Sequence, residues 1–246
     1  MVGENNKVVI VTGGSSGIGR STASALKENG CIVYEFSRRS IPMVGVTHLS
    51  VDVTDEDAVN AAVQQVIQKE TKIDAVINCA GFGISGAVEF TSIEQAKAQF
   101  DVNFFGTVTV NKAVLPFLRH QGKGHIVNIS SVAAVAHIPF QTFYSASKAA
   151  ISSYSYSYAL ANEVKPYGIH VTVVELGDIC TGFTKARQKV FSAMMNTVGV
   201  SPGASVRWSM TSKPAWTRHA LDGTSPVLWR KRTRQSFMLP VHSINS

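Results

Sequence analysis

The sequence predicts a doubly wound α/β fold, in which helices cover both faces of one parallel β-sheet. Short runs rich in valine and isoleucine alternate with longer segments of helical periodicity. The runs are almost continuously apolar, which is typical of strands buried on both faces. A glycine-rich segment follows the first run, where a first strand would turn into a first helix. In such folds the ligand crevice lies beyond the carboxyl ends of the strands.

The predicted elements follow one another in a regular order along the chain. The connection between the second and third strands begins RRSIPMVG and contains Pro42 and Gly45. It is too short for a full helix, so we expect a loop there. The predicted strands are 7–13, 31–37, 46–53, 74–81, 124–131 and 169–176. The predicted helices are 20–28, 56–69, a helix that runs through Asn103 to Leu118, and 144–164.

A chain of 246 residues with this order is expected to form a single domain with an irregular C-terminal segment. We place the folded catalytic domain at 1–190 and an atypical basic segment at 191–246. The periodicity weakens there, and four prolines interrupt the sequence after residue 200. This segment would be a lid or a disordered tail. A change of reading frame or an incomplete gene would produce the same pattern.

The composition excludes an intrinsically disordered chain, because 45% of the residues are apolar and only 16% are charged. The formal net charge of +7 is concentrated at the C-terminus. Seven basic residues and the single acid Asp222 follow residue 200, so this part carries +6. The domain itself is therefore close to neutral, and we expect no nucleic-acid partner. Three tryptophans among the basic residues leave nucleic-acid binding as a minor alternative.

The sequence predicts a cytoplasmic protein. Its N-terminus lacks the pattern of a secretory signal, and no stretch is long and apolar enough to span a bilayer. Its three cysteines, Cys31, Cys79 and Cys180, are odd in number and widely spaced. This argues against a disulfide framework and against a zinc site, so we expect no metal.

The glycine-rich segment VVIVTGGSSGIGR predicts a phosphate-binding turn. Gly13, Gly17 and Gly19 would permit a tight turn, a close approach of the backbone to a pyrophosphate, and close packing of helix on strand. The N–H groups that begin the helix would then face the anion. The spacing differs from the G-x-G-x-x-G fingerprint, but its place in the first strand–helix unit favours a dinucleotide over an ordinary glycine-rich turn.

The end of the second strand predicts a preference for NADP over NAD. An acid at this turn would accept hydrogen bonds from the ribose hydroxyls, whereas a basic residue would pair with the extra phosphate. The segment YEFSRRS supplies Ser37 and Arg38 and no carboxylate at the turn itself, and Arg38 can bind a phosphate with two N–H groups. Glu35 lies on the same strand face as Ser37 and keeps NAD open. Two solvated arginines would be the structural alternative.

Two further strand ends are candidates for the adenosine half of a cofactor. Asp52 in SVDVTD is expected to accept a hydrogen bond from the adenine amino group. Asn78, Ala80 and Gly81 in INCAG form a turn of small residues where the backbone can approach the cofactor. Each signal is weak alone, because strand ends often carry turn-forming residues.

The segment YSASK predicts a proton-transfer pair. Residues four apart share one face of a helix, so the Tyr144 phenol and the Lys148 ammonium would lie together. The ammonium would favour the phenolate and lower the pKa of the phenol. The strand GHIVNISS delivers Ser130 and Ser131 to the same edge. No acid–histidine pairing accompanies Ser131, so the pattern favours substrate binding by this serine and not nucleophilic hydrolysis.

Residues 7–190 resemble the short-chain dehydrogenase/reductase family. The resemblance rests on TGGSSGIG, DV at Asp52, NCAG, Asn103 in DVNFFG, NISS, YSASK and a weaker ELGDICT, in this order and at the expected intervals. AGFGISGAVEFTS and AVLPFLR are most similar to the hydroxysteroid dehydrogenase-like branch. The resemblance implies a Rossmann fold and an oxidoreductase that transfers a hydride between a nicotinamide and a small-molecule carbonyl or secondary alcohol.

The resemblance also implies a role for each matching residue. Tyr144 would be the general acid/base, Lys148 would lower its pKa and hold the nicotinamide ribose, Ser131 would bind the reacting oxygen, and Asn103 would fix a water leading to Lys148. A homodimer or homotetramer would form through the helices that contain Asn103 and Tyr144. The implied cofactor-binding residues are Gly13, Ser15, Ser16, Gly17, Ile18, Gly19, Ser37, Arg38, Asp52, Val53, Asn78, Ala80, Gly81, Tyr144, Lys148, Gly177, Ile179 and Thr181.

One departure from the family pattern lies after the sixth strand. Leu176 stands before Gly177, where the family usually has proline, although Thr181 is present. This departure and the unfamiliar C-terminus leave a second hypothesis open: a dinucleotide-binding sensor or scaffold with little turnover.

Overall fold

A computed structural model describes residues 6–156, 159–177 and 188–190. The chain divides into two compact units, 1–192 and 193–246, and all described residues lie in the first. The predicted segment 191–246 therefore lies outside the described residues.

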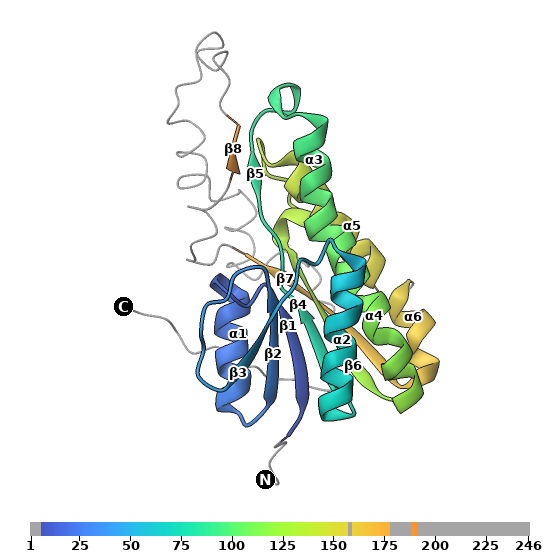
Figure 1. Ribbon diagram of the computed structural model, residues 1–246. Helices are drawn as coiled ribbons and strands as arrows, with labels where there is room; N and C mark the ends of the chain where they lie inside the picture. The colour runs from blue at the N-terminus through green and yellow to red at the C-terminus, as the bar shows by residue number, and fades with distance from the viewer. Residues whose placement is uncertain (1–5, 157–158, 178–187, 191–246) are drawn as a thin grey trace, which may run out of the picture. The chain divides into compact units, whose positions relative to one another are not determined.

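Within the described residues, six parallel strands form one sheet in the order β3-β2-β1-β4-β6-β7 (Figure 1). The order reverses at β1, because the chain moves outward through β2 and β3 and then returns to the other side of β1. The predicted doubly wound fold is thereby confirmed. The strands are β1 Val8–Thr12, β2 Ile32–Ser37, β3 Val46–Ser50, β4 Ala75–Asn78, β6 Gly124–Ser131 and β7 Ile169–Leu176.

Alternate residues of the strands face two separate apolar cores. Ile10 and Phe36 pack against residues of α2 and α4 on one face, whereas Val11 and Val33 pack against α1 on the other. The sheet is thus buried on both faces, which explains its near-continuous apolar strands. The α-helices are α1 Gly17–Glu28, α2 Glu56–Glu70, α3 Ile93–Phe100, α4 Gly106–Gln121, α5 Thr142–Ser155 and α6 Leu160–Val164.

The helix predicted through Asn103 to Leu118 is interrupted by a π-helical turn. Helix α3 begins at a capping box formed by Ser92 and Gln95, and the chain then passes through the turn η2, Asp101–Phe105, into α4. The wider π turn changes the direction of the side chains that it carries, and such turns are frequent at functional sites. Asn103 lies within it.

The prediction of one continuous helix over 144–164 is wrong. Helix α5 ends at Ser155, because Tyr156 adopts extended backbone with ψ of 166°. The sequence SSYSYSY has modest helix propensity, so little opposes a break there. Three short 3₁₀ turns complete the helical elements of the described residues: η1 Val88–Phe90, η3 Val132–Ala134 and η4 Lys165–Tyr167.

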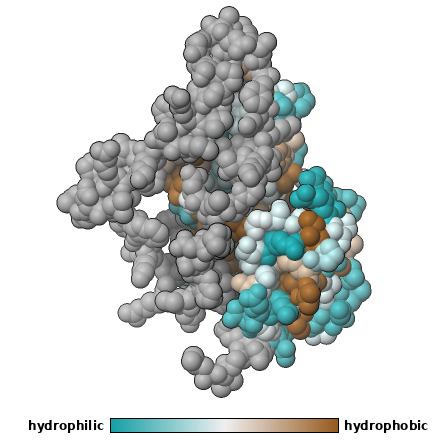
Figure 2. All heavy atoms as spheres, turned by 90° about the vertical axis from the view of Figure 1, so that its left-hand side faces the viewer, coloured by the Kyte–Doolittle hydropathy of each residue, from teal (hydrophilic) through white to brown (hydrophobic). Residues whose placement is uncertain are grey.

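Two shorter features lie outside the main sheet. Residues 38–45 contain no helix, which confirms the predicted loop, and Val44 there is 91% exposed. Figure 2 views the molecule from the left-hand side of Figure 1. On this face, the surface of the described residues is a mixture of hydrophilic and apolar areas. Strand β5 Ile84–Ser85 pairs in parallel with β8 Gln188–Lys189.

Among the helices of the described ranges, none has the length and apolar composition needed to cross a membrane.

Candidate active site

The glycine turn predicted from the sequence joins β1 to α1 at the carboxyl edge of the sheet. Gly13 has φ of +68° and Gly17 has φ of +54°, which are unfavourable for other residues. A Cβ atom at Gly19 would lie 2.5 Å from the Gly13 carbonyl oxygen, so the helix can pack closely on the strand only with glycine there. The three glycines are each required by the local geometry.

The N-terminus of α1 fits the phosphates of a dinucleotide. The N-cap residue Ser16 is exposed and forms no side-chain capping bond, and the first turn carries no acidic residue. The N–H groups of the first turn of α1 are therefore not bonded to the Ser16 side chain, and they lie at the positive end of the helix dipole. A dinucleotide phosphate bound here would accept these hydrogen bonds. Ser15 is buried in the same turn, and Ile18 lies one residue after Gly17.

Thr12, which the sequence analysis did not single out, holds two turns of the site together. Its hydroxyl oxygen accepts hydrogen bonds from the backbone N–H groups of Cys79 and Ala80, at 3.1 Å and 3.0 Å. A Cβ atom at Gly13 would lie 2.8 Å from the Ala80 Cα. The turns after β1 and β4 are consequently in close contact. Thr12 could have been identified from the sequence by its position, because it lies at the end of the first strand, directly before two glycines.

The candidate residues for the adenosine half come together at the ends of β2 and β3. A guanidinium nitrogen of Arg38 lies 3.7 Å from Oδ2 of Asp52. The Arg38 side chain is 74% exposed, so this pair contributes little to stability and leaves the guanidinium accessible to an anion. Ser37 is buried, and its hydroxyl donates to the Arg39 carbonyl oxygen at 3.0 Å. Asp52 Oδ1 accepts from the N–H and hydroxyl of Thr54.

Two predicted cofactor residues direct their side chains into the protein interior. The Asn78 amide donates to the side-chain oxygens of Asn111 and Asn128, both at 2.8 Å. Val53 packs in the larger core, and a Cβ atom at Gly106 would lie 2.6 Å from its side chain. At both positions the side chain is engaged inside the protein, so any contact of these residues with a cofactor would involve the backbone.

Helix α5 carries Tyr144 and Lys148 on one face, as the spacing predicted. The Lys148 Nζ atom lies 6.0 Å from the centroid of the Tyr144 ring. Lys148 is 6% exposed, and its ammonium donates to the Ile129 carbonyl oxygen at 2.8 Å. Burial lowers the pKa of Lys148 from 10.5 to about 8. The half-buried Cys79 thiol lies near this ammonium, and burial raises its pKa to about 12, so the thiol stays protonated.

Asn103 connects the π turn to the helix of the tyrosine–lysine pair. Its amide nitrogen donates to the Ser147 hydroxyl and to the Phe82 carbonyl oxygen, both at 3.0 Å, and its oxygen accepts from the Phe82 N–H at 2.9 Å. A Cβ atom at Gly81 would lie 3.1 Å from this oxygen and 3.8 Å from the Lys148 Nζ. Asn103, Gly81 and Lys148 are thus neighbours.

The two serines at the end of β6 have different surroundings. The Ser130 hydroxyl contacts the Lys148 carbonyl oxygen at 3.0 Å and the Ser152 hydroxyl at 2.8 Å, so it ties β6 to α5. The Ser131 hydroxyl oxygen accepts from the Ala133 N–H at 3.1 Å, which leaves its own proton available to an external acceptor. Ser131 is therefore the better candidate for a substrate oxygen.

The remaining predicted residues lie at or beyond the end of β7. Gly177 follows Leu176 at the same edge, and an added Cβ atom would meet open space. Ile179 and Thr181 lie outside the described residues. Within the described ranges, no group of three or more metal-ligating side chains is present.

Comparisons with known proteins show which family this chain is similar to. A family model described as short chain dehydrogenase matches residues 7–190. A 3-ketodihydrosphingosine reductase of Bacteroides thetaiotaomicron is 47% identical over 182 residues, which cover 74% of this chain and 67% of that protein. A probable short-chain type dehydrogenase/reductase, VdlC, of Helicobacter pylori is 37% identical over 72% of this chain and 67% of its own length.

Solved structures show the same fold. A short-chain dehydrogenase from Streptomyces avermitilis superposes with a TM-score of 0.74 at 32% identity, covering 89% of this chain and 85% of that one. An aldohexose dehydrogenase of Thermoplasma acidophilum gives a TM-score of 0.71 at 29% identity, with 83% and 76% covered. The chain therefore belongs to the short-chain dehydrogenase/reductase family, whose members are NAD(P)-dependent oxidoreductases that act on CH–OH and C=O groups.

Proposed function

We propose that this protein is an NADP-dependent reductase of a carbonyl compound, with Tyr144 as the general acid. The observation that carries the proposal is the buried Lys148 ammonium, one helical turn from Tyr144 and next to Asn103 and Gly81. Burying this ammonium without a carboxylate partner among the described residues costs free energy, and a titratable group perturbed in this way is typical of a functional site.

Each side chain has a distinct task in this proposal. The bound nicotinamide supplies the hydride. The Ser131 hydroxyl donates a hydrogen bond to the carbonyl oxygen, and the Tyr144 hydroxyl delivers the proton that this oxygen gains. The Lys148 ammonium stabilises the phenolate that remains on Tyr144. Asn103 holds the Ser147 hydroxyl and thereby the turn of α5 that carries Tyr144.

The preference for NADP rests on the end of β2. Arg38 is exposed and can present two N–H groups to a 2′-phosphate, and Ser37 is the residue before it. The competing acid, Glu35, is 1% exposed and is bonded to His48. Glu35 is therefore buried, with one carboxylate oxygen bonded to His48, which weakens the case for NAD.

The substrate is proposed by analogy with a relative. The Bacteroides protein that is 47% identical over most of the domain is named as a 3-ketodihydrosphingosine reductase. We therefore take 3-ketodihydrosphingosine as the first ketone to test. The predicted hydroxysteroid dehydrogenase-like branch remains a prediction, and hydroxysteroids are the second class. The cytoplasmic location also remains a prediction.

A direct assay tests the function. Purified protein is mixed with NADPH or NADH and a panel of ketones and secondary alcohols, and nicotinamide absorbance at 340 nm is followed. We expect turnover with NADPH and at least one ketone. Tight NADPH binding without turnover across the panel would favour the alternative hypothesis of a dinucleotide-binding sensor.

A further inference from the structure

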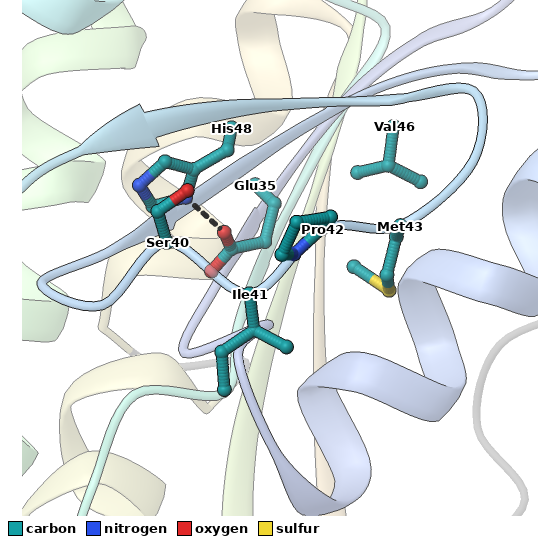
Figure 3. Close-up of a pocket in the computed structure, with 7 residues that line it drawn as sticks. All are labelled: Glu35, Ser40, Ile41, Pro42, Met43, Val46 and His48. Atoms are coloured by element: carbon teal, nitrogen blue, oxygen red, sulfur yellow. Dashed lines mark hydrogen bonds and ion pairs between the residues drawn. The ribbon is translucent and has the colours of Figure 1, made fainter.

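A cavity of about 230 Å³ lies beneath the loop between β2 and β3, and a buried carboxylate lines it. Glu35 from β2 and His48 from β3 meet there, beside residues 40–43 of the loop (Figure 3). The proposed mechanism uses neither side chain.

The register of two strands creates this pair. Glu35 is the direct partner of His48 between β2 and β3, and a carboxylate oxygen of Glu35 lies 2.6 Å from the His48 Nδ1. Glu35 is 1% exposed. Its second oxygen, Oε1, and the His48 Nε2 have no hydrogen-bond partner within the described residues. A buried carboxylate is costly, so its retention calls for a role or for water in the cavity.

The glycine turn rests directly on the Glu35 side chain. A Cβ atom at Gly14 would lie 2.2 Å from the Glu35 Cγ and 3.2 Å from its Oε1. Gly14 is not among the residues with positive φ, so its backbone would accept alanine. Glycine is therefore required at this position by the presence of Glu35 and not by the conformation of the turn.

We propose that Glu35, held by His48, is a positioning residue for dinucleotide binding. Its side chain packs against Gly14 and so fixes the position of the turn 13–16, whose N–H groups would bind the phosphates. The same strand ends at Ser37, directly before Arg38, so one side chain links the two segments proposed to hold the dinucleotide. Phosphate contacts require placement to within about 0.5 Å, which a packed side chain can enforce. The inference rests on the proposed dinucleotide binding.

The competing interpretation is that Glu35 only stabilises the fold and does not affect dinucleotide binding. A double-mutant cycle distinguishes these two interpretations. The variants are Gly14→Ala, Glu35→Ala, the double variant Gly14→Ala/Glu35→Ala, and the conservative control Glu35→Gln. For each variant, the Kd for NADPH is measured by fluorescence titration, and thermal unfolding is measured without NADPH.

The proposal predicts strong coupling between the two positions. Gly14→Ala should weaken NADPH binding about tenfold or more, because the new methyl group displaces the turn from Glu35. Glu35→Ala should weaken binding about threefold to tenfold. The double variant should bind no more weakly than Glu35→Ala alone, because loss of the Glu35 Cγ leaves room for the methyl group and so removes the further loss that Gly14→Ala would cause. Glu35→Gln keeps the shape and should bind within about threefold of the wild type.

Additive losses in the double variant would overturn the proposal, as would lower unfolding temperatures with unchanged Kd values. If Gly14→Ala does not fold, the Glu35 variants decide: weaker binding by Glu35→Ala alone supports the proposal, and equal Kd values for Glu35→Ala and Glu35→Gln overturn it. A wild type that binds neither NADPH nor NADH would remove the proposed function and this inference with it. Binding by the wild type without coupling removes only the inference.

Discussion

Lys148 is a buried cation of the candidate site, and burial lowers its pKa. Burial stabilises its neutral form, so the folded protein binds the proton of Lys148 less tightly than the unfolded chain does. The ammonium therefore costs stability in full below pH 8, and the cost is relieved as the pH rises toward 10.5. This is the opposite of a lysine that gains an acidic partner on folding.

A comparison of the wild type with Lys148→Met tests this linkage. The wild type should gain roughly 2 kcal/mol of unfolding free energy relative to the variant between pH 8 and pH 10. Denaturant titrations without cofactor at several pH values give the difference, and other titrating groups cancel to first order because both proteins contain them. A difference that does not change with pH would contradict the lowered pKa of Lys148.

Arg38 is the residue on which the choice of cofactor depends. Replacing it with aspartate removes a partner for the 2′-phosphate and adds an acceptor for the ribose hydroxyls. We expect Arg38→Asp to weaken NADPH binding about tenfold to a hundredfold and to improve NADH binding. Titration of both cofactors, with Arg39→Asp as the matched control, measures the shift. Equal NADPH affinity in the Arg38 variant would show that another residue binds the phosphate.

A contact could be predicted from the sequence where it joins residues that are close together along the chain. Tyr144 and Lys148 could be paired because a helix repeats every 3.6 residues, so spacing alone fixes their shared face. The contact between Glu35 and His48 could not be predicted, because it depends on which residues of two strands lie opposite each other. The inward direction of Asn78 likewise depends on partners 33 and 50 residues away.

At the scale of elements, the π turn Asp101–Phe105 joins the loop after β4 to helix α5. Helical periodicity predicted one continuous helix here, because the sequence pattern hardly changes across a single wider turn. The turn places Asn103 where its side chain reaches both the Phe82 backbone and Ser147. The predicted role of Asn103 in fixing a water remains untested, whereas its direct bonds give it a positioning role.

Substitution of Asn103 should affect both stability and turnover. Asn103→Ala removes the acceptor for the Phe82 N–H, which we expect to cost about 1–3 kcal/mol. Turnover should fall further than in Gln99→Ala, which removes the bond at 3.0 Å to the same Phe82 carbonyl but has no bond to α5. Thermal unfolding and kcat for both variants provide the comparison. Equal effects on kcat would mean that Asn103 only stabilises the loop.

At the scale of the whole molecule, the sheet edge collects the site from segments far apart in the sequence. The order of the strands brings the ends of β1, β2, β3, β4 and β6 to one edge, and every described candidate residue lies at or near it. This convergence follows from the parallel topology and could be predicted from the alternation of strands and helices. The break after Ser155 could not, since helix propensity is a weak guide to a single boundary.

The predicted homodimer or homotetramer also belongs to this scale. The proposed interface involves the helices α4 and α5, and Phe105, at the junction of the π turn with α4, is 53% exposed. Exposed aromatic side chains are typical of protein interfaces. Sedimentation equilibrium should give at least a dimer, and Phe105→Glu should shift it toward the monomer. A wild type that sediments as a monomer would contradict the proposal.

The most direct test of the central claim is the kcat of Tyr144→Phe in NADPH-dependent reduction of a ketone that the wild type accepts. The proposal predicts that kcat falls by about 10²-fold to 10⁴-fold, because the proton donor is lost, while the Kd for NADPH changes by less than about threefold. Tyr154→Phe, on the same helix, is the matched control and should retain turnover. Unchanged kcat in Tyr144→Phe would contradict the assignment of Tyr144 as the general acid.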